Sequence, residues 1–250
     1  MSHVIITGHS RGVGAALAEN LLQRGFSVLG LARTPNPELA RHQNKSSSTA
    51  GKFSQVTIDL ADTPQLISWL EGNTLSRFLA PASHTYLINN AGMLQPVGPL
   101  GSQDKMALVR SIAVNVTAPM LLANALVAAS PAEIEKRLLH ISSGVGRRPC
   151  AGWSVYAATK AALDHHVRSA ALDAVDKLRV ASIAPGVVDT DMQTEIRASD
   201  PQKFPPLAQF HALKRDGLLS SPADCAEKLV RYLLSAEFTS GAVVDIREMV

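Results

Sequence analysis

The sequence has few aromatic residues and few cysteines. Aromatic residues make up 4% of the 250 residues, while apolar residues make up 46%. Valine, leucine, isoleucine and alanine must therefore fill the core, which favours layered helices and sheet over an aromatic-rich sandwich. The two cysteines, Cys150 and Cys225, allow one disulfide at most, so a disulfide-stabilised scaffold is excluded and a reducing compartment is expected.

Concentrated charge and long apolar runs are also missing. The formal net charge is +3 and the basic residues are scattered, so we expect no nucleic-acid partner. No apolar run approaches the roughly 20 residues that span a bilayer, and the first residues lack the pattern of a signal peptide. We expect a cytoplasmic protein with no membrane partner, and no histidine has the partners at the spacing that a metal site needs.

Short apolar segments alternate with helical patterns along the whole chain, which predicts a parallel sheet with helices on both faces. We expect one α/β domain over residues 1–250, a doubly wound Rossmann-type fold with about seven strands. The polar segment 41–52 is expected to be a surface loop, and segment 191–221 a candidate substrate lid. Strands are expected at 3–8, 27–32, 53–60, 85–90, 138–143, 179–185 and 242–246, and helices at 14–25, 63–71, 103–129, 155–175 and 222–235.

A glycine-rich turn follows the first predicted strand. Residues 7–14 read "TGHSRGVG", with glycines at positions 8, 12 and 14. Glycines let backbone N–H groups approach a pyrophosphate, and the following helix adds the partial positive charge of its N-terminus. The turn therefore predicts a dinucleotide site, although a tight turn without a ligand would have the same composition.

The residues after the second predicted strand indicate which dinucleotide is bound. A carboxylate at this point holds the ribose 2′-hydroxyl of NAD, whereas arginine accommodates the 2′-phosphate of NADP. The sequence reads "GLARTP" and places Arg33 there, with Arg11 in the glycine turn as a second cation. Two guanidinium groups suit a phosphate, so we predict NADP(H). The alternative is that both arginines are solvated surface residues.

Tyr156 and Lys160 lie four residues apart in "WSVYAATKAAL". Residues at this spacing share a helix face and can point into one cleft. An ammonium about 4 Å from a phenol contributes roughly 4 kcal/mol at an effective dielectric of about 20, which would lower the pKa of the phenol. Such a phenol can pass a proton to a carbonyl oxygen. Ser143, at the end of the fifth strand, can hold that oxygen, while Ser142 should point to the other face.

These motifs together resemble the short-chain dehydrogenase/reductase family over nearly the whole chain. The resemblance rests on "TGHSRGVG", on "NNAG" at 89–92, on "VNV" around Asn115, on the Ser–Tyr–Lys set and on "PGVVDT" at 185–190. It implies that Tyr156 is the general acid, that Lys160 binds the nicotinamide ribose and lowers the pKa of Tyr156, and that Ser143 orients the carbonyl. Asn115 would hold a water in a proton relay. Cofactor binding is implied for Gly8, Ser10, Arg11, Gly12, Val13, Gly14, Arg33, Asp59, Leu60, Asn89, Ala91, Gly92, Tyr156, Lys160, Pro185, Gly186, Val188 and Thr190.

Closer similarity points to the branch of this family that contains sepiapterin reductase and bacterial benzil reductase. "ARTP", "GWSVYAATKAALD" and "SGAVVDIRE" are similar to that branch. The resemblance implies that Asp245 anchors a substrate; the alternative is that it is an exposed residue that closes the last strand. Trp153 and Met192 are candidates for the substrate pocket, together with Ser143 and Tyr156.

We therefore expect an NADPH-dependent carbonyl reductase acting on a small ketone or vicinal dicarbonyl. A dehydrogenase of a hydroxylated metabolite or steroid is the alternative among enzymes, and a catalytically silent NADP-sensing or scaffold protein is the alternative outside them. A homodimer or homotetramer is implied by the resemblance.

Overall fold

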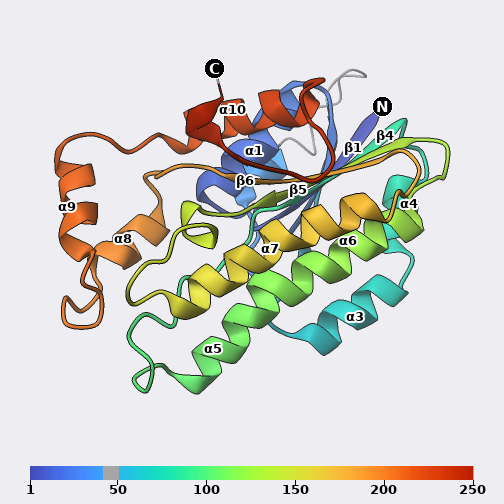
Figure 1. Cartoon of the computed structure of the whole chain (residues 1–250). Helices are drawn as coiled ribbons and strands as arrows, with labels where there is room; N and C mark the ends of the chain where they lie inside the picture. The colour runs from blue at the N-terminus through green and yellow to red at the C-terminus, as the bar shows by residue number, and fades with distance from the viewer. Residues whose placement is uncertain (42–50, 250) are drawn as a thin grey trace.

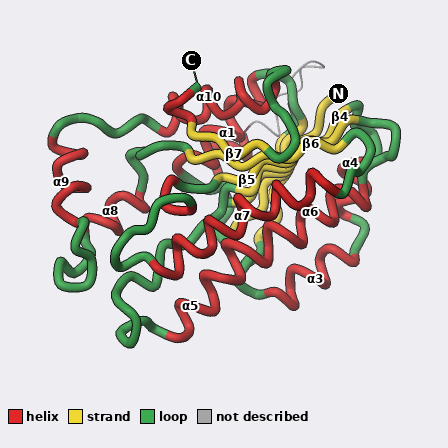
Figure 2. The backbone as a smooth tube through the Cα atoms, viewed as in Figure 1, coloured by secondary structure: helices red, strands yellow, loops and turns green. Residues whose placement is uncertain are grey.

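Seven parallel strands form one sheet in the computed structural model, which describes residues 1–41 and 51–249. The strand order is β3-β2-β1-β4-β5-β6-β7, so the direction of winding reverses between β1 and β4. Figure 2 shows the strands side by side, with helices on both faces. The predicted doubly wound fold is confirmed. The strands are β1 (Ser2–Thr7), β2 (Ser27–Ala32), β3 (Phe53–Thr57), β4 (His84–Asn89), β5 (Glu135–Ile141), β6 (Leu178–Ala184) and β7 (Ala242–Asp245).

Helices cover both faces of the sheet (Figure 1). On one face α1 packs against α10, and on the other α5 and α6 follow one another along one line, with α7 beside them. The helices are α1 (Gly12–Gln23), α2 (Pro37–Ala40), α3 (Thr63–Glu71), α4 (Thr74–Leu79), α5 (Lys105–Ile112), α6 (Ala118–Ala129), α7 (Ser154–Leu172), α8 (Asp191–Arg197), α9 (Leu207–Arg215) and α10 (Pro222–Leu234). Shorter turns are the π-turn η2 (Ala113–Thr117) and the 3₁₀ turns η3 (Gly144–Gly146) and η4 (Ile246–Glu248).

Burial on both faces explains why the strands read as continuous apolar runs. Every residue of β2 is buried, as are the last five residues of β1 and of β4. One core cluster lies between the sheet and α1 and α10, and a second between the sheet and α3, α4, α6 and α7. A parallel sheet covered on both sides needs this composition.

The predicted helix 103–129 is continuous from Lys105 to Ala129 but contains the π-turn η2. By length and composition alone this helix could cross a membrane, contrary to the expectation that no apolar run is long enough. Its buried residues, among them Leu122 and Leu126, pack in the core beneath the sheet. That is the placement of a core helix.

Two segments outside the sheet were also predicted. Most of the expected surface loop 41–52 lies outside the described residues. The candidate lid contains α8 and α9, which Figure 1 shows extending away from the sheet beyond the end of α7.

Candidate active site

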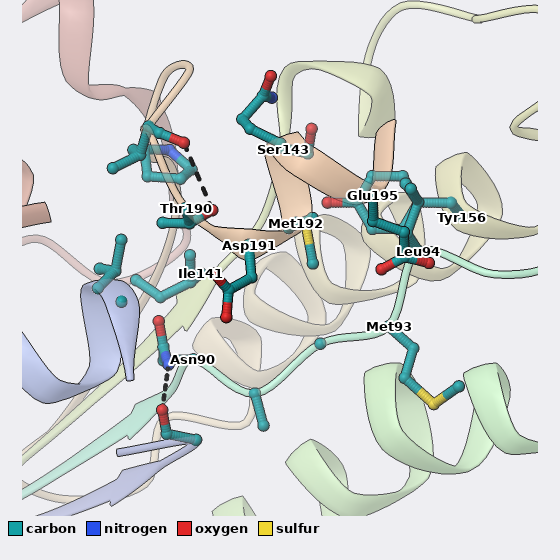
Figure 3. A pocket seen from close by; sticks show the side chains of 18 of the residues that line it. Asn90, Met93, Leu94, Ile141, Ser143, Tyr156, Thr190, Asp191, Met192 and Glu195 are labelled. Carbon is teal, nitrogen blue, oxygen red and sulfur yellow. Dashed lines mark hydrogen bonds between the residues drawn. The ribbon is translucent and has the colours of Figure 1, made fainter. Parts of the chain in front are cut away.

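A cavity of about 1470 Å³ runs along the carboxyl ends of the strands. Residues after β1, β2, β4, β5 and β6 line it, and α8 and α9 close one side. In Figure 3, Asn90 lies toward one end, and Ser143, Met192 and Tyr156 lie toward the other. Ligands of open parallel sheets bind at this edge, where the strand order reverses.

The glycine turn has the backbone that close approach to a phosphate requires. Gly8 and Gly12 have φ of 71° and 56°, in the region that favours glycine. A side chain at Gly14 would collide with the Gly8 carbonyl. Asn90 fixes the turn, because its Nδ2 donates to the Thr7 carbonyl oxygen at 3.0 Å and its backbone N–H donates to Thr7 Oγ1.

The first turn of α1 has free donors. Its N-cap, Arg11, makes no side-chain capping hydrogen bond, so the first N–H groups of α1 are available to an anion. The glycine turn, in which a side chain at Gly14 would collide with the backbone, leads into a 12-residue helix. This arrangement matches the pyrophosphate of a nicotinamide dinucleotide. The residues present therefore fit the cofactor that the sequence predicts.

The part of the cavity that follows β1, β2 and β3 carries both predicted arginines and Asp59. Arg33 is exposed, and Arg11 pairs with Asp191 at 3.1 Å, both side chains being largely exposed. Partial burial of Asp59 acts to raise its pKa, but hydrogen bonds from the Ala61 N–H and from the Arg110 guanidinium lower that pKa. Asp59 is thus a fixed anion with one oxygen on Arg110.

Tyr156 and Lys160 lie on one face of α7, as the spacing predicts, and both side chains are buried, at 7% and 4% exposure. Lys160 Nζ donates to the Ile141 carbonyl oxygen at 2.9 Å and lies 5.6 Å from the centre of the Tyr156 ring. The end of β5 therefore meets the face of α7 that carries Tyr156 and Lys160.

Burial has the larger effect on both titrating groups. It raises the pKa of Tyr156 to about 12, with the Ser143 hydroxyl acting in the opposite direction. It lowers the pKa of Lys160 to about 8, with Asp164 acting in the opposite direction. The pKa of Tyr156 is therefore raised rather than lowered, because desolvation of the phenol dominates. That Lys160 acts in the opposite direction stays a prediction.

Asn115 lies in the π-turn η2 and is fully buried. Its Oδ1 accepts from the Met93 N–H at 2.8 Å, and its Nδ2 donates to the Met93 carbonyl at 2.8 Å and to Thr159 Oγ1 at 3.1 Å. A Cβ on Gly92 would lie 3.5 Å from Lys160 Nζ and 3.6 Å from Asn115 Oδ1. Asn115 therefore stands behind the cavity wall, close to Lys160, and holds the chain after β4.

Aromatic side chains form the wall between the cavity and the lid. Trp153 stacks on Phe204 with ring centres 4.6 Å apart, and lies 5.3 Å from Phe210 and 5.6 Å from Tyr156. Met192 and Phe210 line the cavity from the lid. Trp153 thus lines the cavity, as expected from the sequence, and also packs against the lid.

Most residues singled out from the sequence line the cavity, and three do not. Asn89 is buried and donates to the Pro119 carbonyl and His140; its neighbour Asn90 lines the cavity instead. Asp245 is 2% exposed and accepts hydrogen bonds from Arg247, so the side chain expected to anchor substrate is occupied. Asn115 is the third, as described above. Those that line the cavity are Gly8, Ser10, Arg11, Gly12, Val13, Gly14, Arg33, Asp59, Leu60, Ala91, Gly92, Ser143, Trp153, Tyr156, Lys160, Pro185, Gly186, Val188, Thr190 and Met192.

Sequence reasoning missed several cavity residues. Arg148 and Arg247 line the cavity near Ser143, and Glu195 lines it from α8. The arginines lie in irregular turns, where no periodicity predicts the direction of a side chain. For Asn90 the alternation of side chains along a strand was only a partial signal, because it separates neighbouring residues at a strand end but does not say which of them faces the cavity.

Comparison with known proteins agrees with this geometry. The family model for short chain dehydrogenase matches residues 2–201. Benzil reductase ((S)-benzoin forming) from Bacillus cereus is 34% identical over 252 residues, covering 99% of this chain and 100% of its own. Sepiapterin reductase from Rattus norvegicus is 32% identical, covering 98% of this chain and 96% of its own. The crystal structure of a short-chain dehydrogenase/reductase from Burkholderia vietnamiensis is 41% identical with a TM-score of 0.71, covering 100% and 98%. The chain thus belongs to the short-chain dehydrogenase/reductase family, whose members are oxidoreductases that act on carbonyl or hydroxyl groups with a nicotinamide cofactor.

Proposed function

We propose that the protein is an NADPH-dependent carbonyl reductase that acts on small ketones and vicinal dicarbonyls. The observation that carries the proposal is a single cavity with the Ser143, Tyr156 and Lys160 side chains at one end and the glycine turn with Arg33 at the other. A relative named benzil reductase aligns over the full chain, which supports a dicarbonyl.

The chain's own residues account for binding of the cofactor. The N–H groups at the start of α1 would hold the pyrophosphate, Arg33 and Arg11 the 2′-phosphate, and Thr190 and Lys160 the nicotinamide end. Arg11 must exchange its exposed pair with Asp191 for the phosphate, a small cost because exposed ion pairs contribute about 0–1 kcal/mol. When bound, the reduced nicotinamide supplies a hydride for the carbonyl carbon.

Tyr156 supplies the proton. A phenol with its pKa raised to about 12 is fully protonated at neutral pH, so it carries the proton that the carbonyl oxygen needs. Because the same shift makes it a weaker acid, donation requires that a neighbouring charge stabilise the phenolate. Ser143 donates a hydrogen bond to the same oxygen. The Lys160 ammonium stabilises the phenolate left behind, since an opposite charge in a buried site favours the charged form. The alcohol leaves with one hydride on carbon and one proton on oxygen.

The substrate end of the cavity fits an aryl ketone. Leu94, Trp153, Ile196 and Phe210 provide an apolar lining around Tyr156, and Figure 3 shows Leu94 beside the Tyr156 side chain. A mostly apolar pocket with a few placed polar groups is the usual form of a small-molecule site.

The test measures reduction of benzil with NADPH and with NADH, for the wild-type chain and two variants. We expect Tyr156→Phe to lose at least 10²-fold in kcat while retaining NADPH binding by fluorescence titration. We expect Arg33→Asp to weaken NADPH far more than NADH, because it removes a phosphate ligand and adds a like charge. Turnover that survives Tyr156→Phe would remove the assigned acid. Equal effects of Arg33→Asp on the two cofactors would remove the NADPH preference.

A further inference from the structure

Three arginines converge beside Ser143 from two distant segments of the chain. Arg147 and Arg148 follow the turn η3, and Arg247 belongs to η4 near the C-terminus. A Cβ on Gly144 would lie 3.8 Å from Arg148 Nη2 and 4.0 Å from Arg247 Nη2. Gly144 follows Ser143 directly, so two guanidinium groups stand beside the residue that orients the carbonyl.

One buried carboxylate serves this arginine group. Asp245 accepts from Arg247 Nη2 at 2.6 Å and from Arg247 Nε at 2.8 Å, and it lies 3.7 Å from Arg147 Nη2. Arg147 also donates to the Val244 carbonyl. The charge of Glu248 also raises the pKa of Arg247, by less than Asp245 does, but Glu248 does not line the cavity. Asp245 therefore fixes the position of Arg247 and neutralises it.

Arg148 is left with an uncompensated charge. Its side chain is exposed, lines the cavity and has no hydrogen-bond or ion-pair partner within residues 1–41 and 51–249. None of the acidic residues that line the cavity pairs with Arg148: Asp59 is engaged with Arg110, Asp189 with Lys214 and Glu195 with the Gln95 amide. The fourth, Asp191, pairs with Arg11 until the cofactor phosphate takes that arginine. The substrate end of the cavity thus presents an unpaired guanidinium next to a pre-positioned one.

We infer that the substrate is a carbonyl compound carrying a carboxylate, which Arg148 binds, with Arg247 beside it, while Ser143 and Tyr156 hold the reacting oxygen. One free guanidinium matches a singly charged carboxylate, which it can bind through two parallel hydrogen bonds. A phosphate of charge near −2 would call for more free cations. The inference rests on the proposed function and narrows its substrate class.

The experiment compares kcat/KM for benzil with kcat/KM for its 3-carboxylate and 4-carboxylate derivatives, with NADPH at low salt. These probes differ from benzil by one charged group on a ring. We expect at least one acid to be preferred over benzil by about tenfold, the size of one charge-assisted hydrogen-bonded contact in partly solvated surroundings. The preference should shrink in 0.5 M NaCl because Arg148 is exposed.

Two variants locate the effect. Arg148→Gln should bring the ratio of acid to benzil close to one, whereas Arg77→Gln should leave it at the wild-type value. Arg77 is another exposed arginine, on α4. It precedes β4 in the chain and thus lies at the amino ends of the strands, away from the cavity at their carboxyl ends.

The results test the substrate class and the proposed function separately. If benzil is reduced but neither acid is preferred, or if the preference persists in Arg148→Gln, the inference is overturned and the proposed function stands. If neither benzil nor the acids are reduced with NADPH, the proposed function fails and the inference fails with it.

Discussion

Phe204 is the side chain that anchors the segment between α8 and α9, and replacing it should free this segment without unfolding the domain. Phe204 is 0% exposed and stacks on Trp153, with 24° between the ring planes. It belongs to a small cluster with Leu94, Tyr156 and Ile196, separate from the two clusters that hold the sheet. A Phe204→Ala change therefore weakens the contact between the candidate lid and the active site.

The expected magnitude follows from burial. Phe→Ala at a fully buried site costs about 3–5 kcal/mol, through lost transfer free energy and the cavity left behind. If the segment opens as a local unit, a loss of about 3 kcal/mol makes its amide hydrogens exchange about 10²-fold faster. The KM for benzil should rise as well, because Met192 and Phe210 would no longer wall the cavity.

The assay is hydrogen exchange followed by mass spectrometry, with Phe238→Ala as the matched control. Phe238 is also 0% exposed but belongs to the main core, with its ring centre 5.2 Å from that of Tyr232. Its loss should lower the global Tm by about 6–20 °C, with exchange in residues 191–215 rising no more than elsewhere. Phe204→Ala should do the reverse, raising exchange in 191–215 with a small change in Tm.

One result would refute this reasoning. If Phe204→Ala lowers the Tm as much as Phe238→Ala does, and exchange in residues 191–215 keeps pace with that of the sheet, then the segment unfolds only with the domain. It would then be a fixed wall rather than a lid.

Three further predictions concern titrating groups and the glycine turn. The kcat/KM for reduction should fall above about pH 8, because burial lowers the pKa of Lys160 to about 8 and the ammonium is lost there. In a pH profile, Asp164→Asn should move the midpoint of this fall to lower pH, because the Asp164 charge raises the pKa of Lys160. A midpoint that does not move would exclude Lys160 as its source. The pKa of His140 is lowered from 6.5 to about 3 by burial. Between pH 6.5 and about pH 3, His140 is therefore protonated in the unfolded chain but neutral in the folded one, so the folded state loses stability as the pH falls. Between pH 6.5 and 5 this amounts to about 2 kcal/mol, which urea titrations should detect in the wild type and find reduced in His140→Gln. Gly14→Ala should weaken NADPH binding at least tenfold in fluorescence titrations, because the new Cβ meets the Gly8 carbonyl; unchanged affinity would mean that the turn does not approach the cofactor.

The sheet could be predicted from the sequence because strands buried on both faces keep continuous apolar runs, as β2 does. The glycine turn and the pairing of Tyr156 with Lys160 could be predicted because both follow from local geometry. What failed depended on tertiary packing. Asn89 and Asn90 differ by one position, and only the register of β4 decides which of them faces the cavity.

The pKa of Tyr156 and the partner of Asp245 could not be predicted from the sequence either. The pKa of Tyr156 depends on how completely the surrounding elements exclude water, and burial outweighed the expected influence of Lys160. The partner of Asp245 depends on a turn two residues later, whose arginine folds back onto the carboxylate. Neither property has a periodic signature.

The π-turn around Asn115 has a consequence for how the molecule can change over evolution. In a regular helix each residue advances the side-chain direction by about 100°, and a π-turn is one residue wider than the turn it replaces. Deleting a single residue between Ala113 and Thr117 would therefore swing all of α5 by about a quarter of a revolution relative to α6, or carry Asn115 away from Met93. Such a deletion would be tolerated only together with changes in either the outer surface of α5 or the support behind Lys160, and an insertion at this point would impose the same demand.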